Sequence, residues 1–337
     1  MRMNHYRNLL ILIVVFGFST FTGWSEKTDA QTKKAVEKTP ASVKPTPSAK
    51  KQIIVSVTAA RIRSDKNLQS DTLQYADLGT VFTVLEETDE WSKIKLPDNK
   101  EGWISKTITE DFSSANKTKI YNSIADKYLV NEKLDFLTAA NVYYFLKKAG
   151  NETESAELEL KAYKMLAKTL ALMPFDKLNE NPYKNFTDKN ESEIVYSEPA
   201  GQWFVHAERL WELHAKNKNK PLGEEIAWQA AQTFLPGECE GYVNCYVYTL
   251  RVTDGEYLNF YPAGKHSRQA LLNITNFLEP IYQDAGQKAV YTGPYDISDR
   301  AELNKHLAEL RMIISKTPYV EKQKTINQIN KIAEAFK

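Results

Sequence analysis

The 337-residue sequence has almost no excess charge of either sign. Lysine and arginine together number 44, and aspartate and glutamate number 43, which gives a formal net charge of +1. A chain without a positive excess has no long-range field to hold nucleic acid or an anionic membrane surface. We therefore expect no nucleic-acid partner. Hydrophobic residues still make up 42% of the chain, which is enough for a packed core and excludes a mainly disordered protein.

Cysteine is nearly absent, and its two occurrences are Cys239 and Cys245. In an oxidising compartment, two thiols six positions apart can form a local disulfide. The alternative is half of a zinc site, but residues 237–245 contain neither a C-x-x-C spacing nor a histidine. We predict a disulfide and no metal. The acidic neighbours of Cys239 also disfavour the thiolate, so this residue would be a poor nucleophile.

Long hydrophobic runs are also scarce, and the clearest one covers residues 9–18. Basic residues precede this run, and small and polar residues follow it up to position 25, which is the three-part layout of a secretory signal. We predict a signal peptide over residues 1–25 and export to the periplasm or the extracellular space. A membrane-spanning helix needs about 20 apolar residues. An uncleaved N-terminal membrane anchor, with the polar residues of 19–23 counted in the span, is the alternative.

The next segment lacks large apolar side chains. Residues 26–51 consist mainly of Lys, Thr, Ala, Ser and Pro, and they cannot bury enough surface to offset the entropy lost on ordering. We predict a disordered linker that acts as a soluble spacer. Its excess of lysine leaves a weak attraction to anionic lipid or wall polymer as the alternative.

Residues 53–108 show the alternation and turn punctuation of short β-strands. Loops rich in Asp, Asn, Ser and Gly separate segments of β-branched and aromatic residues. The apolar positions are Ile53, Val55, Val57, Val81, Phe82, Val84, Leu85, Trp91, Ile94, Leu96, Trp103 and Ile104. Four or five strands fit, and so small a sheet must close on itself to protect its edges. We predict a small all-β barrel over residues 52–109.

Four motifs in this block resemble the bacterial SH3 domain family. The family pattern runs through x-V-R-S, L-x-x-G-x-x-V-x-V, W-x-x-V and G-W-V segments, and residues 62–64, 78–81, 91–94 and 102–104 occupy these places in the same order. Gly79 falls where a turn precedes a strand, and Gly102 falls where the chain bends before Trp103. The first loop departs from the family, because Asp65 and Lys66 replace the usual Gly-Pro-type pair. We therefore expect a different ligand-facing loop.

The resemblance implies a module that binds rather than catalyses. Such modules in exported proteins bind cell-wall peptide or glycan, or an envelope protein, in a shallow groove between loops. Aromatic faces stack on sugars and peptides, and guanidinium groups pair with carboxylates. The candidate ligand-binding residues are therefore Arg61, Arg63, Tyr75, Trp91 and Trp103. The alternatives are that both tryptophans belong to the barrel core and that Arg63 is a solvated strand residue.

After residue 110 the apolar periodicity becomes helical. One expected helix face carries Leu134, Leu137, Val142 and Phe145, another carries Leu160, Tyr163, Ala167 and Leu170, and a continuous stripe carries Leu303, Leu307, Leu310 and Ile314. Further helices are predicted over 201–216, 222–234, 242–260, 266–282, 299–314 and 319–336. Residues 175–199 and 292–298 are predicted as breaks, the first being a long surface loop.

Residues 256–271 resemble the helix-turn-helix signature of tetratricopeptide-like repeats, in which a Tyr-Pro-x-Gly turn joins two helices. Pro262 and Gly264 end one helix, and Ala270 is small enough for the next helix to pack closely. One copy is visible, whereas a solenoid needs three or more. We predict an all-α helical bundle over residues 110–337 with one such hairpin, giving a multi-domain chain.

No catalytic constellation was found in the sequence. G-x-S-x-G, phosphate-loop and G-x-G-x-x-G motifs are missing, and His206 and His214 lack the H-E-x-x-H spacing. We therefore expect a non-enzymatic, cofactor-free binding or scaffold protein of the cell envelope, with a helical domain for protein interaction. The alternative is a cell-wall lytic enzyme that uses carboxylates of the helical half, such as Glu208, Glu224 or Glu225.

Overall fold

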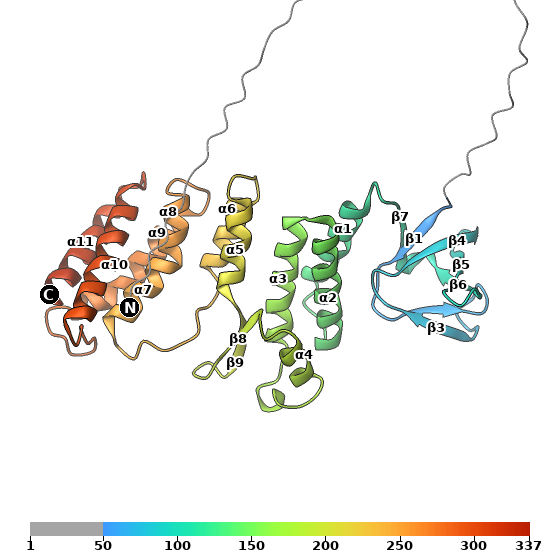
Figure 1. The fold of residues 1–337 in the computed structure, drawn as a ribbon, viewed down its shortest axis with the longest axis horizontal. Coiled ribbons are helices and arrows are strands. Elements are labelled where there is room, and N and C mark those ends of the chain that lie inside the picture. Colours follow the sequence, from blue (N-terminus) through green and yellow to red (C-terminus); the bar gives the residue numbers. More distant parts are fainter. Residues whose placement is uncertain (1–49) are drawn as a thin grey trace, which may run out of the picture. The chain divides into compact units, whose positions relative to one another are not determined.

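The computed structural model describes residues 50–337, which form a β-barrel followed by helices (Figure 1). The predicted signal peptide at 1–25 and nearly all of the predicted linker at 26–51 lie outside the described residues. Within the described part of the chain, no helix combines the length and the apolar character needed to cross a membrane. The predicted fold class, a small β-barrel followed by a helical region, is confirmed.

The barrel contains seven short strands rather than the four or five expected. These are β1 (Gln52–Val55), β2 (Ala60–Arg63), β3 (Thr72–Ala76), β4 (Val81–Glu87), β5 (Trp91–Lys95), β6 (Glu101–Ser105) and β7 (Thr109–Phe112). They pair antiparallel in the order β3-β2-β6-β5-β4-β1-β7. The sequence pattern missed β7 because its residues, Thr-Glu-Asp-Phe, show no apolar alternation. Its pairing with β1 is a long-range contact.

Alternate strand positions supply the barrel core. The buried residues that form this core are Ile53, Val55, Ala60, Ile62, Ala76, Phe82, Ile94, Leu96 and Ile104. Because successive strand residues point to opposite faces, the neighbours of these residues lie on the outer face of the sheet. The outer face therefore carries the charged and aromatic side chains on which binding was predicted to depend.

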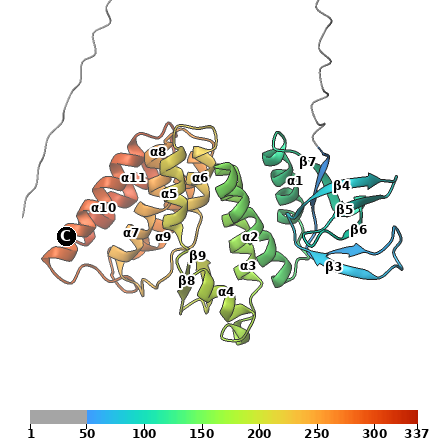
Figure 2. The same cartoon turned by 45° about the vertical axis from the view of Figure 1, so that its right-hand side comes forward.

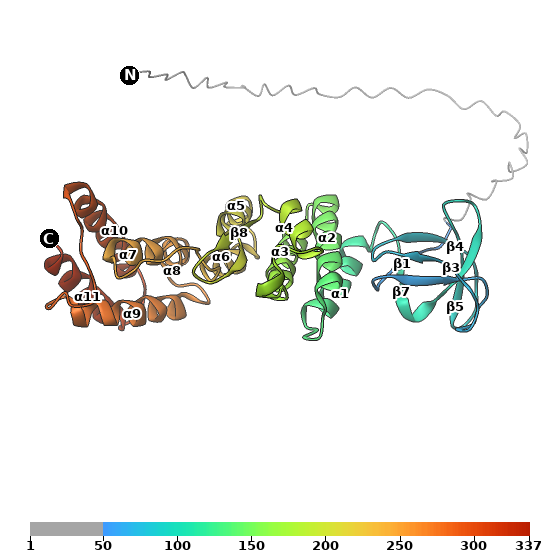
Figure 3. The same cartoon turned by 90° about the horizontal axis from the view of Figure 1, so that it is seen from below.

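The helical part runs from residue 117 to residue 335. Its elements are α1 (Lys117–Leu129), α2 (Phe136–Thr153), α3 (Ala156–Ala171), α4 (Tyr183–Lys189), α5 (Ala207–Asn217), α6 (Gly223–Ala231), α7 (Val243–Val252), α8 (Asp254–Phe260), α9 (Ser267–Asp284), α10 (Ile297–Ser315) and α11 (Lys322–Ala335). Neighbours in sequence pack together, namely α2 with α3, α5 with α6, α8 with α9, and α10 with α11. Helices α9 and α11 also lie side by side (Figures 2 and 3).

Four sequence-based expectations about the helical part are wrong. The supposed surface loop at 175–199 contains α4 and β8 (Ile194–Ser197), and β8 pairs with β9 (Gln202–Val205) where a helix was expected. Phe186 and Ile194 of this region are buried in the core around α2 and α3. Long-range packing therefore orders a segment whose local composition is that of a loop.

The other two corrections concern single helices. Leu137 and Ala167 are exposed, because α2 and α3 bury neighbouring positions instead. The helix predicted over 242–260 is broken at Thr253, where φ is −108° and ψ is −106°, so it becomes α7 and α8. By contrast, the stripe of α10 is confirmed, since all four of its predicted residues are buried.

The predicted hairpin forms between α8 and α9, and its turn explains the glycine. A Cβ atom at Gly264 would lie 2.9 Å from the Tyr257 hydroxyl and even closer to the Glu224 carboxylate. Tyr257 Oη donates to Glu224 Oε1 over 2.7 Å and accepts from the His266 backbone N–H over 3.0 Å. Ala270 is fully buried against the preceding helix. A carboxylate from α6 thus holds the turn, and only glycine fits beside it.

The barrel joins the helices through the turn between β3 and β4. Gly79 in this turn has a φ of +84°, and a Cβ atom there would lie 2.6 Å from ring carbons of Phe145 in α2. Two backbone hydrogen bonds of Val55 fix the turn. The Gly79 N–H donates to the Val55 carbonyl, and the Val55 N–H donates to the Thr80 carbonyl, both over 2.9 Å. Ile54 is buried in the same core as α1, α2 and α3. Barrel and helices therefore share apolar packing.

We expect Gly79→Ala to lower the free energy of unfolding by about 2 kcal/mol or more, because the new methyl group meets a ring and the positive φ disfavours a side chain. Urea denaturation would measure this effect. Gly237→Ala is the matched control, since Gly237 also has a positive φ, +119°, and a Cβ atom there meets no heavy atom within 4 Å. Equal stability of the two variants would contradict the proposed close contact.

Asp254, at the start of α8, is a buried carboxylate without a cationic partner among the described residues. Gln232 Nε2 and Asn273 Nδ2 donate to its Oδ1 over 3.1 Å and 3.2 Å. Burial raises the pKa of Asp254 to about 6 and outweighs these two hydrogen bonds, which lower it. Because the pKa in the unfolded chain is about 3.9, the protonated carboxyl stabilises the fold. This contribution is complete below about pH 4 and is lost as the pH rises through about 6.

Asp254→Asn keeps the acceptor oxygen and removes the charge. We expect it to raise the unfolding free energy at pH 7.5 by up to about 3 kcal/mol, and we expect the gain to vanish near pH 4. Urea denaturation at the two pH values checks this, with the exposed Asp89→Asn as a control. A gain that is independent of pH would show that the carboxylate charge is not its cause.

Candidate ligand-binding site

All five residues predicted to bind ligand lie on the outer face of the sheet formed by β3, β2, β6 and β5. Arg61 pairs with Tyr75, Arg63 pairs with Trp103, and Trp91 pairs with Ser105. The intervening residues Ile62, Ile94 and Ile104 are buried in the barrel core, so the predicted set faces the other way. The fold thus brings the set onto one face.

The residues of this face differ in exposure. Trp91 and Trp103 are only 7% and 8% exposed, although they do not belong to the barrel core. Lys66 of the β2–β3 loop places its Nζ 5.4 Å from the centre of the Trp103 ring. Arg63 is 9% exposed and donates from Nη1 to the Ser70 carbonyl over 2.8 Å. The loop that departs from the family pattern therefore covers Trp103 and is tied down by Arg63.

Among the five predicted residues, the accessible ones form a single pair. Arg61 is exposed, Tyr75 is 60% exposed, and the Arg61 guanidinium carbon lies 6.0 Å from the centre of the Tyr75 ring. Ligand binding by the five residues stays a prediction. The geometry puts its accessible surface at this pair rather than at the tryptophans.

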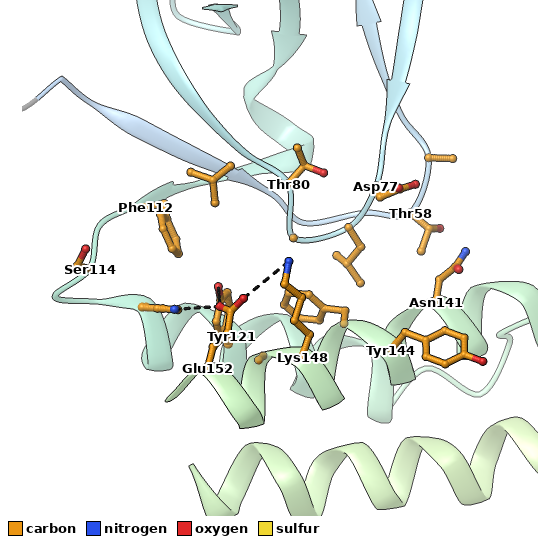
Figure 4. A pocket seen from close by; sticks show the side chains of 17 residues that line it. Thr58, Asp77, Thr80, Phe112, Ser114, Tyr121, Asn141, Tyr144, Lys148 and Glu152 are labelled. Carbon is orange, nitrogen blue, oxygen red and sulfur yellow. Dashed lines mark hydrogen bonds and ion pairs between the residues drawn. The ribbon is translucent and has the colours of Figure 1, made fainter. Parts of the chain in front are cut away.

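A larger cavity, of about 750 Å³, lies between the barrel and the helices. Figure 4 shows barrel loops with Thr58, Asp77 and Thr80 on one side and α2 with Asn141, Tyr144, Lys148 and Glu152 on the other. We call this cavity the junction cleft. Phe112, the last residue of β7, and Ser114, in the connection to α1, close one end of it.

An aromatic cluster supports the junction cleft. The rings of Phe112 and Tyr121 are 6.1 Å apart, and Tyr121 meets Phe145 edge to face at 5.3 Å. Tyr121 donates from Oη to Glu152 over 3.4 Å. Burial, together with the nearby Glu152 charge, raises the pKa of Tyr121 to about 12, so this hydroxyl stays a hydrogen-bond donor at any physiological pH.

Charged groups of both signs line the junction cleft. Lys117 Nζ lies 2.9 Å from Glu152 Oε2, and this ion pair holds the pKa of Glu152 below its ordinary value. Lys148 is 77% exposed and 3.7 Å from the same carboxylate. Asp77 is exposed and makes no side-chain hydrogen bond or ion pair with any residue from 50 to 337. Lys148 and Asp77 can therefore turn to an external carboxylate and an external amine.

The sequence contains a signal for half of this site. Asn141, Tyr144, Lys148 and Glu152 follow one another at spacings of three, four and four, which places them on one helix face. Such a polar stripe is typical of a solvated helix, so by itself it does not predict a binding site. The contact between Gly79 and Phe145 brings a barrel loop over this face, and that contact cannot be found from local pattern.

The carboxylates of the lytic alternative have structural partners. Glu224 holds the α8–α9 turn through Tyr257 and the Lys265 backbone N–H. Glu225 lies 3.4 Å from Lys164 Nζ and 3.5 Å from His266 Nε2. Glu208 is 74% exposed, beside His206, which precedes α5 rather than lying within it.

The predicted disulfide is present between Cys239 and Cys245. It ties the loop before α7 to the first turn of that helix. Among residues 50–337 no group of three or more His, Cys, Asp or Glu side chains is placed to hold a metal ion. Metal binding and catalysis were not expected from the sequence, and both expectations stay predictions.

A comparison with known protein families found a match within the barrel. The family model of the bacterial SH3 domain matches residues 58–109, from the β1–β2 connection to the start of β7. This segment is therefore a bacterial SH3 domain, as its four motifs predicted, and domains of this kind are generally protein-binding or wall-binding modules. A search of curated proteins found no match to the chain.

The burial of the outer face predicts unequal effects of truncation. We expect Trp103→Ala to lower the unfolding free energy by about 3 kcal/mol, because it removes a buried indole. Tyr75→Ala should change it by less than about 1 kcal/mol, since the ring is mostly exposed. Chemical denaturation of both variants measures this. A Tyr75 variant as unstable as the Trp103 variant would contradict the assigned exposures.

Proposed function

We propose that the protein is exported and acts in the bacterial cell envelope as a non-enzymatic binding or scaffold protein. Its SH3 domain and α2 together bind a peptide in the junction cleft, and the cell-wall stem peptide is the ligand that fits best. The observation that carries this proposal is the cleft itself. It places Lys148 and Asp77, whose charges are weakly engaged, beside Tyr144, which is 38% exposed.

The charge pattern favours peptide over glycan at this site. A wall stem peptide presents carboxylates and a free amine, whereas the glycan backbone is largely uncharged. Lys148 can take a carboxylate and Asp77 can take an amine, because neither side chain is held by a short ion pair. Charge-assisted hydrogen bonds of this kind contribute about 1.5–3 kcal/mol each.

The walls of the junction cleft are held in place by the fold, which favours a ligand-binding role for it. Two backbone hydrogen bonds to Val55 hold the loop around Gly79, and the Tyr121 and Phe145 rings fix the floor beneath it. A preorganised cleft loses little conformational entropy when its ligand binds. The bacterial SH3 assignment of residues 58–109 supports the same class of function.

The remaining helices serve protein interaction in this proposal. Tyr295 and Ile297, around the start of α10, are 76% and 85% exposed and offer a partner an apolar contact. The disulfide between Cys239 and Cys245 is compatible with export into an oxidising compartment.

Binding of a synthetic wall stem peptide to the full mature chain tests the proposal by calorimetry. We expect the double variant Lys148→Ala/Asp77→Asn to weaken binding by about a hundredfold, since each lost charge-assisted contact is worth about tenfold. The control is Lys119→Ala/Asp89→Asn, which removes the same charges from exposed positions outside the cleft. Equal affinity of the two double variants would reject the cleft as the peptide site.

Incubation with purified peptidoglycan separates binding from lysis. Co-sedimentation without release of soluble fragments supports the binding function. Release of fragments that disappears in Glu225→Gln would overturn it in favour of the lytic alternative.

A further inference from the structure

A second cavity, of about 250 Å³, lies within the helical part, between α3, the strand β9 and the helices α5 and α6. None of its lining residues belongs to the junction cleft. We call it the helical pocket. Pockets for drug-sized ligands hold about 300–1,000 Å³. The helical pocket therefore suits a smaller unit, of the size of one ring with its substituents.

Aromatic rings form part of its wall. Phe204 of β9 and Phe234, just after α6, stack at 4.2 Å with an angle of 28° between their planes. Phe234 is 45% exposed, and the neighbouring Trp203 and Tyr163 also line the cavity. Apart from its stacking on Phe204, the Phe234 ring is therefore open to a ligand. An apolar face of a small ligand would cover it.

Side-chain amides complete the wall. Gln202 and Gln229 line the pocket, and neither side chain forms a hydrogen bond within the described residues. Gln232 also lines it and donates from Nε2 to the buried Asp254, which leaves its carbonyl oxygen as an acceptor. Each primary amide both donates and accepts, so the set matches a ligand with several hydroxyl or amide groups.

Charge is nearly absent from this pocket. Lys164 is the one charged residue in its lining, and its Nζ lies 3.4 Å from Glu225 Oε1. The pocket thus offers no unpaired charge to a carboxylate, a phosphate or an amine. The ligand that fits these walls is uncharged.

From these observations we infer that the helical pocket binds one neutral sugar ring, such as an N-acetylhexosamine unit. The apolar C–H face of a pyranose covers the exposed phenylalanine, and its hydroxyl and acetamido groups exchange hydrogen bonds with the glutamine amides. This site is separate from the peptide site of the junction cleft, and its failure would leave that proposal standing.

A proline side chain is the competing occupant, because proline also packs on aromatic rings. Proline-rich segments dock in extended aromatic grooves with few hydrogen bonds. The helical pocket is small and carries three amides, of which two are free of partners in the described chain. This polarity favours a sugar.

Saturation-transfer NMR on the full mature chain tests the inference, with N-acetylglucosamine, methyl glucoside and N-acetylproline amide as probes. A single ring binds weakly, with a Kd of about 1 mM as the expected scale. We expect transfer to N-acetylglucosamine, and we expect Phe234→Ala and Gln229→Met each to weaken binding about tenfold or more. Both changes leave the buried core intact.

The controls are Phe277→Ala and Gln323→Met, which alter exposed residues of the same types outside the pocket. These should bind like the unmodified protein. Absence of transfer to every sugar, an unchanged Kd in Phe234→Ala, or stronger binding of the proline amide would each overturn the inference. Transfer to N-acetylglucosamine alone would place the acetamido group among the recognised features, whereas transfer to both sugars would place recognition on the ring.

Discussion

The turn around Gly79 rests directly on the ring of Phe145, and the arrangement of barrel and helices depends on this contact. Only a residue without a side chain can approach the ring so closely, and only glycine adopts the positive φ of this turn without strain. The two hydrogen bonds to Val55 carry the constraint back into the sheet. Gly79, the glycine of the SH3 motif, therefore has two functions. It forms the turn before β4, and it allows α2 to pack against this turn.

The junction cleft follows from this contact. Where the turn touches α2 the surfaces close, and beyond the contact the polar stripe of α2 faces barrel loops across open space. The same stripe on a solitary helix would face water. The fold thus converts an ordinary solvated helix face into one wall of a site, and the second wall comes from residues 58–59 and 77–81 of the SH3 domain.

The α8–α9 turn also depends on a glycine that leaves room for a side chain from a distant element. Gly264 makes room for the Glu224 carboxylate, which arrives from α6 and satisfies the turn. A carboxylate that resembles a catalytic candidate in the sequence is thereby engaged in holding two helices together. In both cases a glycine marks the place where a distant element must approach the backbone.

Local signals were enough to predict the SH3 domain, the disulfide, the stripe of α10 and the hairpin turn, because strand alternation, helical spacing and turn chemistry act over a few residues. They also named the residues of one sheet face, but not their accessibility, since Lys66 and Arg63 bring a loop over Trp103. The strand β7, the elements between 175 and 205 and the junction cleft were decided by tertiary structure alone. Each depends on contacts between residues far apart in sequence, and local pattern does not record such contacts.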